Sequence, residues 1–530
     1  MLGYVFSWPV SLSVPFTLAD LVLLWCYSSF IFAVSMERWN LHRKLALKFL
    51  LLIGERPRMM MAGFMAITAF LSMWISNTAT TSMMTPLVLA VLGQLSKDDS
   101  PASPSGEPDS AAGLASDDHM ALDHDNGDLE ATSTTSTDES GVELQMIPMS
   151  AEPAAGPESD EDHLRFSKAS LLGIAYAASI GGTATLVGTG TNVILVQTFS
   201  RLFPHAAPIS FGGWFLFASP LAILLLCVTF VLLIVLFARN TSVRVSKRHL
   251  EVEHDRVGPV SWAQLVLCAD LIFMVACWFI RPILANKGIL KPGYITDGTI
   301  SMVAGLILFV IPSRQEAAPG ESVESPVTVV DGGERLPHPL EKKKVITRLA
   351  DNETLLDVPW DIVMLLGGGL ALAEGFQASG LSLVLAQKLN ILSSMPLYLM
   401  ISLVCLVVLF TTELTSNIAT VTLVLPILAA MAQSAHQHPL LLMIPATICC
   451  SLAFMLPVAT PPNAIVFSSN VLKVIDMAKS GLLLNILSLL LVPAYMLTLG
   501  SVIFGINFKV FPAWAQPPPS PSSSPSQVSM

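Results

Sequence analysis

Two segments decide the fold of this chain: Ser76-Asn77-Thr78-Ala79-Thr80 and Ser416-Asn417-Ile418-Ala419-Thr420. Each lies within a long apolar stretch, and each is followed at the same offset by a proline, Pro86 in the first case and Pro426 in the second. Polar side chains are costly at membrane depth unless they serve a site. Because the pattern occurs twice, it predicts an internal duplication built around one site.

The composition is that of a membrane protein. Of the 530 residues, 53% are hydrophobic and 13% are charged, whereas about 25% of the residues in a typical soluble domain are charged. The mean hydropathy is +0.65. Apolar windows of the roughly 20 residues needed to cross a bilayer recur along the chain. We therefore expect an all-α polytopic membrane protein, because helices satisfy their own backbone polar groups in lipid.

The charge of the chain is unevenly distributed. The formal net charge is −11, yet residues 97–163 contain 18 acidic residues and one lysine, which is −17, so the remainder carries +6. This acidic stretch has too few large apolar residues to form a core, and we expect it to be disordered. Basic residues cluster over Arg38–Arg58, Arg239–Arg256 and Arg314–Arg348. The positive-inside rule places these three clusters in the cytosol.

These patterns divide the chain into six predicted parts. They are truncated first-repeat helices with the Ser-Asn-Thr motif (1–95), a disordered acidic cytoplasmic loop (96–165), helices that complete the first repeat and lead into the second (166–312), a disordered basic loop (313–350), a second-repeat hairpin with the Ser-Asn-Ile motif and the final helices (351–514), and a disordered tail (515–530).

Each motif is followed by a second shared element rich in glycine or proline. The first covers Gly181–Asn192 and the second Leu456–Asn463, and both place a threonine three residues before the final asparagine. Regular helix does not persist at this density of glycine and proline, so we expect unwound turns between half-helices. Such backbone survives at membrane depth only where it lines a cavity or packs inside protein.

The chemistry of these elements suits ions of both signs. Carbonyl, hydroxyl and amide oxygens are ligands for a hard monovalent cation such as Na⁺, whereas free N–H groups at helix starts attract an anion. Hydrogen bonding between helices is the structural alternative for a single motif, but two matching pairs favour a transport site. Glu413, beside the second motif, is either a cation or proton site or a structural partner, and we favour the structural role. No triad, metal motif or phosphate loop indicates an enzyme, and nothing indicates nucleic-acid binding.

Several of these stretches resemble a known family. The residues are Ser76–Thr81 with Pro86, Gly181–Leu186, Gly367–Gly369 and Phe454–Phe467. They resemble solute carrier family 13, the sodium-coupled di- and tricarboxylate or sulfate transporters among the divalent-anion:sodium symporters. The resemblance implies two inverted repeats, each with a re-entrant hairpin and a broken helix, and a scaffold and a transport domain that work as an elevator. It also implies a homodimer in the plasma membrane that co-transports Na⁺.

The resemblance assigns site residues by motif. The first Na⁺ site takes Ser72, Ser76, Asn77 and the Gly188 backbone, and the second takes Thr412, Thr415, Asn417 and the Ala459 backbone. The substrate carboxylates meet Asn77, Thr78, Thr189, Asn417, Thr460 and Pro461.

Two departures from the family pattern bear on function. Ile418 stands where the family motif has a threonine and cannot donate a hydroxyl hydrogen bond. An apolar residue here resembles the citrate-preferring branch, so the resemblance favours citrate over smaller dicarboxylates such as succinate, with a sulfate-type symporter as an alternative. The amino end also looks truncated, because Ser28–Ile31 stands where the Gly-Gly turn of a first hairpin is expected. A second hypothesis is therefore a transport-inactive isoform that regulates full-length partners.

Overall fold

The computed structural model describes residues 31–53, 56–98, 157–239, 257–288, 297–313, 348–357, 395–508 and 510–516, with eight isolated positions between them. Most of the predicted acidic and basic loops lies outside the described residues, as do the tail beyond residue 516, Ser28–Phe30, Gly367 and Gly369. Within the described ranges the regular elements are helices, and one isolated bridge pairs Pro312 with Arg348. The predicted all-α class agrees with this part of the chain.

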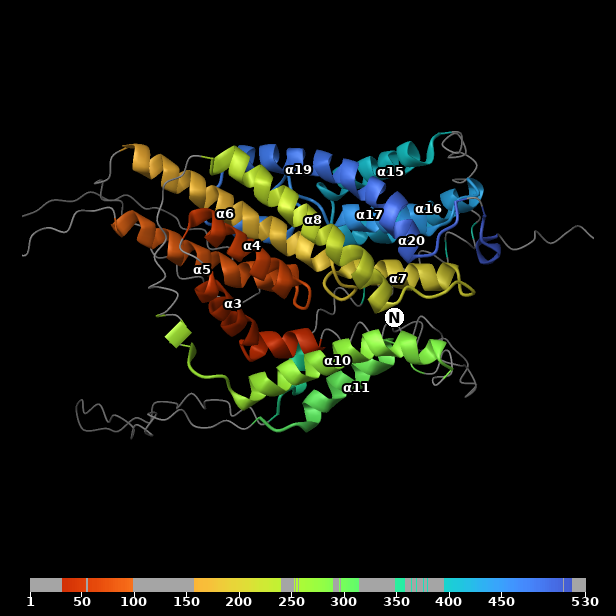
Figure 1. Cartoon of the computed structure of the whole chain (residues 1–530), viewed down its shortest axis with the longest axis horizontal. Coiled ribbons are helices and arrows are strands. Elements are labelled where there is room, and N and C mark those ends of the chain that lie inside the picture. Colours follow the sequence, from red (N-terminus) through yellow and green to blue (C-terminus); the bar gives the residue numbers. More distant parts are fainter. Residues whose placement is uncertain are drawn as a thin grey trace, which may run out of the picture.

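A helical segment over residues 31–38 precedes the named helices, which are labelled in Figure 1 except for α12 and α18. In chain order these are α3 (Leu41–Leu52), α4 (Pro57–Ser72), α5 (Asn77–Asp98), α6 (Pro157–Thr183), α7 (Gly190–Leu202), α8 (Phe211–Phe237), α10 (Trp262–Asn286), α11 (Asp297–Val310), α12 (Asn352–Leu356), α15 (Leu397–Thr412), α16 (Asn417–Ser434), α17 (Leu440–Cys450), α18 (Pro461–Phe467), α19 (Val474–Tyr495) and α20 (Ser501–Ile503).

Each Ser-Asn motif lies at the tip of a helical hairpin. Helix α4 ends at Ser72 and α5 begins at Asn77, and in the second half α15 ends at Thr412 and α16 begins at Asn417. The following prolines, Pro86 and Pro426, lie inside α5 and α16 rather than at their ends. The hairpin that the structure describes in the first half is therefore α4–α5. Ser28–Phe30, where the family pattern places the Gly-Gly turn of a first hairpin, lie outside the described residues.

The element that follows each hairpin is a helix interrupted by non-helical backbone. Helix α6 ends at Thr183 and α7 begins at Gly190, whereas α17 ends at Cys450 and α18 begins at Pro461. The second interruption starts earlier than the predicted Leu456 and ends where proline occupies the first helical position, the one place in a helix that proline favours. Both predicted turns are present.

The two halves of the chain interlock. Helix α18 of the second half packs against α5 and α6 of the first, and α16 packs against α7. The second half-helix of each interrupted pair therefore contacts the hairpin of the other half. Figure 1 shows the result as one bundle, with α10 and α11 lying together along one side of it and α3 between.

Several described helices have membrane length and composition. Four are long and apolar enough to cross a bilayer: α8, α10, α16 and the continuous stretch Val474–Ile503. Helices α11, α15 and α17 are apolar but shorter. Large apolar side chains of α8 and α19 remain exposed on the outside of the bundle. This is the expected surface of a polytopic protein in lipid.

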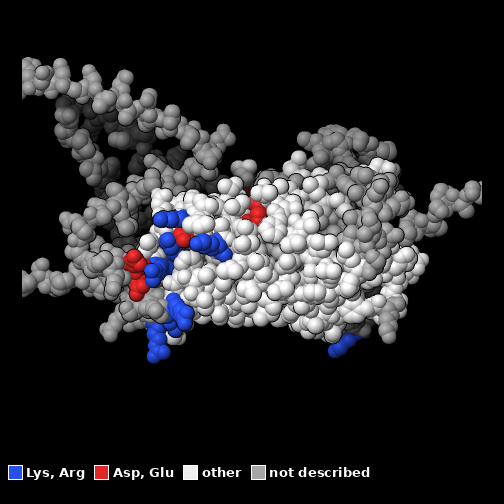
Figure 2. Space-filling model, turned by 90° about the horizontal axis from the view of Figure 1, so that it is seen from above, with Lys and Arg blue, Asp and Glu red and all other residues white. Residues whose placement is uncertain are grey.

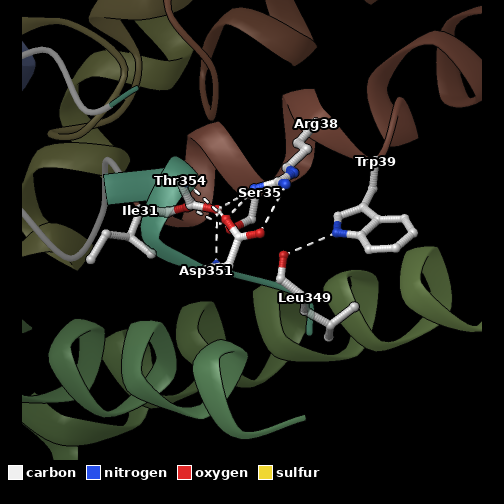
Figure 3. Close-up of polar contacts among 7 residues, drawn as sticks. All are labelled: Ile31, Ser35, Arg38, Trp39, Leu349, Asp351 and Thr354. Atoms are coloured by element: carbon white, nitrogen blue, oxygen red, sulfur yellow. Dashed lines mark hydrogen bonds and ion pairs between the residues drawn. The ribbon is translucent and has the colours of Figure 1, made fainter. Parts of the chain in front are cut away.

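A polar cluster joins the start of the described chain to the segment before α12 (Figure 3). The Arg38 guanidinium meets both carboxylate oxygens of Asp351, with 2.9 Å between Nη2 and Oδ2, and lies 3.1 Å from Thr354 Oγ1. Beside it, Trp39 Nε1 donates to the Leu349 carbonyl at 3.0 Å. A paired guanidinium and carboxylate of this geometry hold the two segments in register.

We predict that Arg38→Gln and Asp351→Asn each lower the thermal stability of the purified protein. We also predict that the stability loss of the double variant is smaller than the sum of the two single losses. Both side chains are partly exposed, at 15% and 30%, so a coupling energy of about 1 kcal/mol is expected. A double-mutant cycle from thermal unfolding measures the coupling. Fully additive losses would show that the two groups do not support each other.

Candidate functional site

A cluster of three oxygen atoms forms beneath the first motif. The buried Ser72 Oγ lies 2.5 Å from Asn77 Oδ1 and 2.7 Å from the Ala178 carbonyl oxygen of α6. The hydroxyl has one proton to share between two acceptors. The cluster is therefore rich in oxygen lone pairs and poor in protons, which suits a cation.

The second half builds the same cluster from different residues. Thr412 Oγ1 lies 2.7 Å from Asn417 Oδ1 and 2.9 Å from the Cys450 carbonyl at the end of α17. In both halves the hydroxyl ends the first helix of the hairpin, the asparagine begins the second, and the carbonyl comes from the interrupted helix. The predicted pairs Ser72–Asn77 and Thr412–Asn417 are thus brought together by the fold.

Two asparagines brace the interrupted helices. Asn192 Nδ2 donates to the Thr185 carbonyl at 2.7 Å, and Asn463 Nδ2 donates to the Ala453 and Leu456 carbonyls at 3.1 and 3.0 Å. These bonds pair carbonyl groups that have no hydrogen-bond partner within a helix. Leaving such groups unpaired away from water costs free energy. The Thr-x-x-Asn spacing was visible in sequence, but the bracing role of Asn192 and Asn463 was not deduced from it.

Threonines stand at the start of both second half-helices. Thr189 and Thr460 are extended, with φ near −148° and −143°, and precede α7 and α18 as their N-cap residues. Thr460 Oγ1 accepts from the Asn463 N–H at 3.5 Å. A hydroxyl contact of 2.7 Å between Thr191 and Ser451 joins the start of α7 to the end of α17. The start of α7 presents N–H groups that suit an anion, whereas α18 begins with two prolines, which have no N–H.

The remaining predicted residues have local roles or lie at the surface. Ser76 Oγ accepts from the Ala79 N–H at 3.2 Å, and Thr415 Oγ1 lies 3.0 Å from the Thr411 carbonyl and 2.6 Å from Thr420 Oγ1. The structure does not place these two hydroxyls in the oxygen clusters, because each completes its own hairpin turn. Other predicted positions are buried Gly188, partly buried Ala459, exposed Thr78 and exposed Pro461.

Glycines allow the first hairpin to approach the interrupted helix. A Cβ atom at Gly181 would overlap the Ala69 backbone, and one at Gly182 would overlap Asn77 Oδ1. A Cβ atom at Gly188 would lie 2.5 Å from the Gly182 carbonyl oxygen and 3.0 Å from that of Ser72. These three positions have no room for a side chain, which accounts for the glycine-rich sequence.

Glu413 holds the second interruption in place. Its buried carboxylate accepts from the N–H groups of Phe454, Met455 and Leu456 at 2.8 to 3.3 Å. The Asn485 side chain of α19 donates to the same carboxylate at 2.8 Å. Three consecutive backbone donors converge on one acidic side chain, so the structural role favoured from sequence is the one seen.

Comparison with known proteins supplies the family. The model of the sodium:sulfate symporter transmembrane region matches residues 18–506. The chain belongs to this family. A rat Na⁺/citrate cotransporter is 38% identical over 517 residues, covering 92% of this chain and 83% of the relative. Human solute carrier family 13 member 2 is 37% identical over 92% of this chain and 82% of its own length, and rat solute carrier family 13 member 1 is 36% identical over 91% and 82%.

Membership of the sodium:sulfate symporter family makes the chain a membrane transporter and not an enzyme. Na⁺ is the co-transported ion. The resemblance to solute carrier family 13 inferred from the motifs is confirmed.

We predict that Gly182→Ala abolishes most of the Na⁺-dependent stabilisation of the purified protein. The added methyl group displaces Asn77 Oδ1 from the first oxygen cluster. The measurement is the melting temperature in NaCl against choline chloride. The control is Gly212→Ala, where the nearest atom to the new Cβ is Phe279 Cδ1 at 3.6 Å, an ordinary contact. A Gly182→Ala protein with an undiminished Na⁺ response contradicts the assignment.

We predict that Glu413→Gln raises the Na⁺ concentration for half-maximal stabilisation about tenfold. The amide nitrogen cannot accept from the backbone donors, and a lost hydrogen bond to a charged group costs about 1.5–3 kcal/mol. The same Na⁺ titration measures the effect. Glu161→Gln is the control, since Glu161 is exposed and pairs only with Arg165 on its own helix in the described contacts. An unchanged Na⁺ titration would show that Glu413 does not support the second oxygen cluster.

Proposed function

We propose that this protein carries citrate, or a dicarboxylate such as succinate, into the cell together with Na⁺ across the plasma membrane. The observation that carries the proposal is the doubled oxygen cluster, built around Ser72 and Asn77 in one half and Thr412 and Asn417 in the other. Each cluster binds one Na⁺, and the substrate carboxylates lie between them.

The proposed site holds its anion without a basic side chain. None of the residues assigned to it by motif is lysine or arginine, so the N–H groups at the starts of α5, α7 and α16, the nearby hydroxyls and the bound Na⁺ supply the positive potential. Binding of the anion then depends on Na⁺, and its release follows when Na⁺ leaves. This dependence is the basis of symport.

The preference for citrate rests on one side chain and one relative. Ile418, at the start of α16, is partly buried and presents no hydroxyl where the first motif has Thr78. A relative that is 38% identical is a Na⁺/citrate cotransporter. The description of the family also includes sulfate symport, so sulfate is the competing substrate to be tested.

Alternating access in this proposal is of the elevator type. The hairpins and interrupted helices form one interlocked bundle, and α10 and α11 pack together along one side of it (Figure 1). We propose that the bundle is the transport domain, that α10 and α11 belong to a scaffold, and that two copies associate through their scaffolds. The two halves are then inverted repeats.

We predict that Thr412→Val and Ser72→Ala abolish Na⁺-dependent uptake of labelled citrate while surface expression is kept. Each substitution removes the hydroxyl at the centre of one oxygen cluster. The matched controls are Thr411→Val and Ser82→Ala, whose exposed hydroxyls bond their own helices and are expected to leave uptake within about twofold. Uptake is measured in NaCl and in choline chloride.

Competition by unlabelled succinate and sulfate ranks the substrates in the same assay. Citrate uptake at full rate in choline contradicts sodium coupling. Na⁺-dependent uptake of labelled sulfate by a protein that takes up neither citrate nor succinate contradicts the carboxylate assignment and leaves the sodium sites standing.

A further inference from the structure

A charged cavity lies at one end of the bundle, away from the proposed substrate site. Its volume is about 310 Å³, and it is bounded by the start of α6, the end of α8 and the start of α19. The lining residues are Asp162, Arg165, Lys168, Leu236, Phe237, Arg239 and Asp476. Figure 2 shows lysine and arginine side chains gathered at one end of a face that is otherwise almost free of charge.

The basic side chains of this cavity are positioned by specific contacts. Lys168 Nζ lies 2.8 Å from Asp476 Oδ2, with both side chains less than one fifth exposed. Arg58 Nη2 donates to the Arg239 carbonyl at 2.8 Å, which brings a further guanidinium to the rim. Arg165 and Arg239 are both exposed at the rim. The lining therefore has a small excess of positive charge, three basic side chains against Asp162 and Asp476, and Arg165 is itself paired with Glu161 at 2.9 Å.

Apolar surface leads directly to the cavity. Val231 and Val235 of α8 are exposed by 58% and 59%, and Ile475 and Leu482 of α19 by 55% and 38%. Leu236 and Phe237 then line the cavity itself. In a membrane-spanning bundle such apolar faces are covered by acyl chains, so the charged cavity lies at the depth of the lipid headgroups.

The side of the membrane follows from chain topology. The acidic segment that the sequence predicts in the cytosol connects α5 to α6, and the basic cluster that begins at Arg239 follows α8. The ends of α6 and α8 that bound the cavity adjoin these two segments, so the cavity faces the cytoplasmic leaflet. That leaflet holds the anionic phospholipids.

We propose that this cavity binds the headgroup of an anionic phospholipid of the cytoplasmic leaflet. The phosphate lies among Arg165, Lys168 and Arg239, and the acyl chains follow the apolar faces of α8 and α19. The lipid thereby ties together three helices of the bundle at its cytoplasmic end. The proposal needs a membrane protein but no particular transported substrate, so it stands or falls separately from citrate transport.

The test is a lipid titration of the purified full-length chain in neutral detergent, followed by its melting temperature. The probes are phosphatidylserine, phosphatidylcholine and inorganic phosphate. We expect phosphatidylserine to stabilise the protein more than phosphatidylcholine does. Arg239→Gln should weaken the apparent affinity for phosphatidylserine about fivefold, the factor for one basic residue near an anionic surface. Lys287→Gln, the same loss of charge at the far end of α10, should leave it unchanged.

A substitution of opposite sign separates binding from general stability. Asp476→Asn removes the acid that pairs with Lys168, so it should tighten phosphatidylserine binding by a similar factor while weakening the protein without lipid. Equal effects of the two lipids overturn the proposal, as does an Arg239→Gln protein with unchanged affinity. Equal protection by inorganic phosphate shows a free-anion site instead. Absence of any lipid response in the full chain likewise overturns the proposal.

Discussion

Backbone that leaves the helix at membrane depth must still have its polar groups paired, and this constraint governs the whole site. Three side chains meet it. Asn192 and Asn463 donate to freed carbonyls of the two interruptions, and Glu413 accepts from freed N–H groups of the second. Because these bonds fix the backbone, each oxygen cluster keeps its carbonyl in place before any ion arrives. The cost of an interrupted helix is thus offset by the same residues that shape the site.

The duplication is close but not exact, and the differences fall beside the oxygen clusters. Where the second half has Glu413, the first has Met73, whose carbonyl accepts from Thr185 Oγ1 at 2.6 Å. Where Thr415 bonds Thr420, the first half has Ile75 and a buried Thr80 hydroxyl with no partner among the described residues. The second turn is therefore held by a charged acceptor and the first by a neutral one. The two proposed Na⁺ sites are therefore expected to differ in stability.

Crossed packing turns two local motifs into one site. A hairpin alone presents an oxygen cluster to its own interrupted helix, but α18 lies against α5 and α16 against α7. The hydroxyl contact between Thr191 and Ser451 also connects α7 of the first half to the end of α17 in the second half. Displacement of either hairpin therefore disturbs the half-helix of the other half. This coupling gives a mechanical reason for the proposed joint binding of Na⁺ and the anion.

The sequence by itself determined the membrane class, the helical class, the duplicated Ser-Asn motifs and the two interruptions, because hydropathy and the glycine and proline content act locally. The motifs that carry the family resemblance also assigned Ser72, Asn77, Thr412 and Asn417 to the proposed site. Only the tertiary structure decided that the motifs are hairpin tips and that Glu413 holds a turn some 40 residues away along the chain. Both features depend on which backbone groups, distant in sequence, come within hydrogen-bonding distance in the fold. Residue spacing within one segment does not predict such contacts.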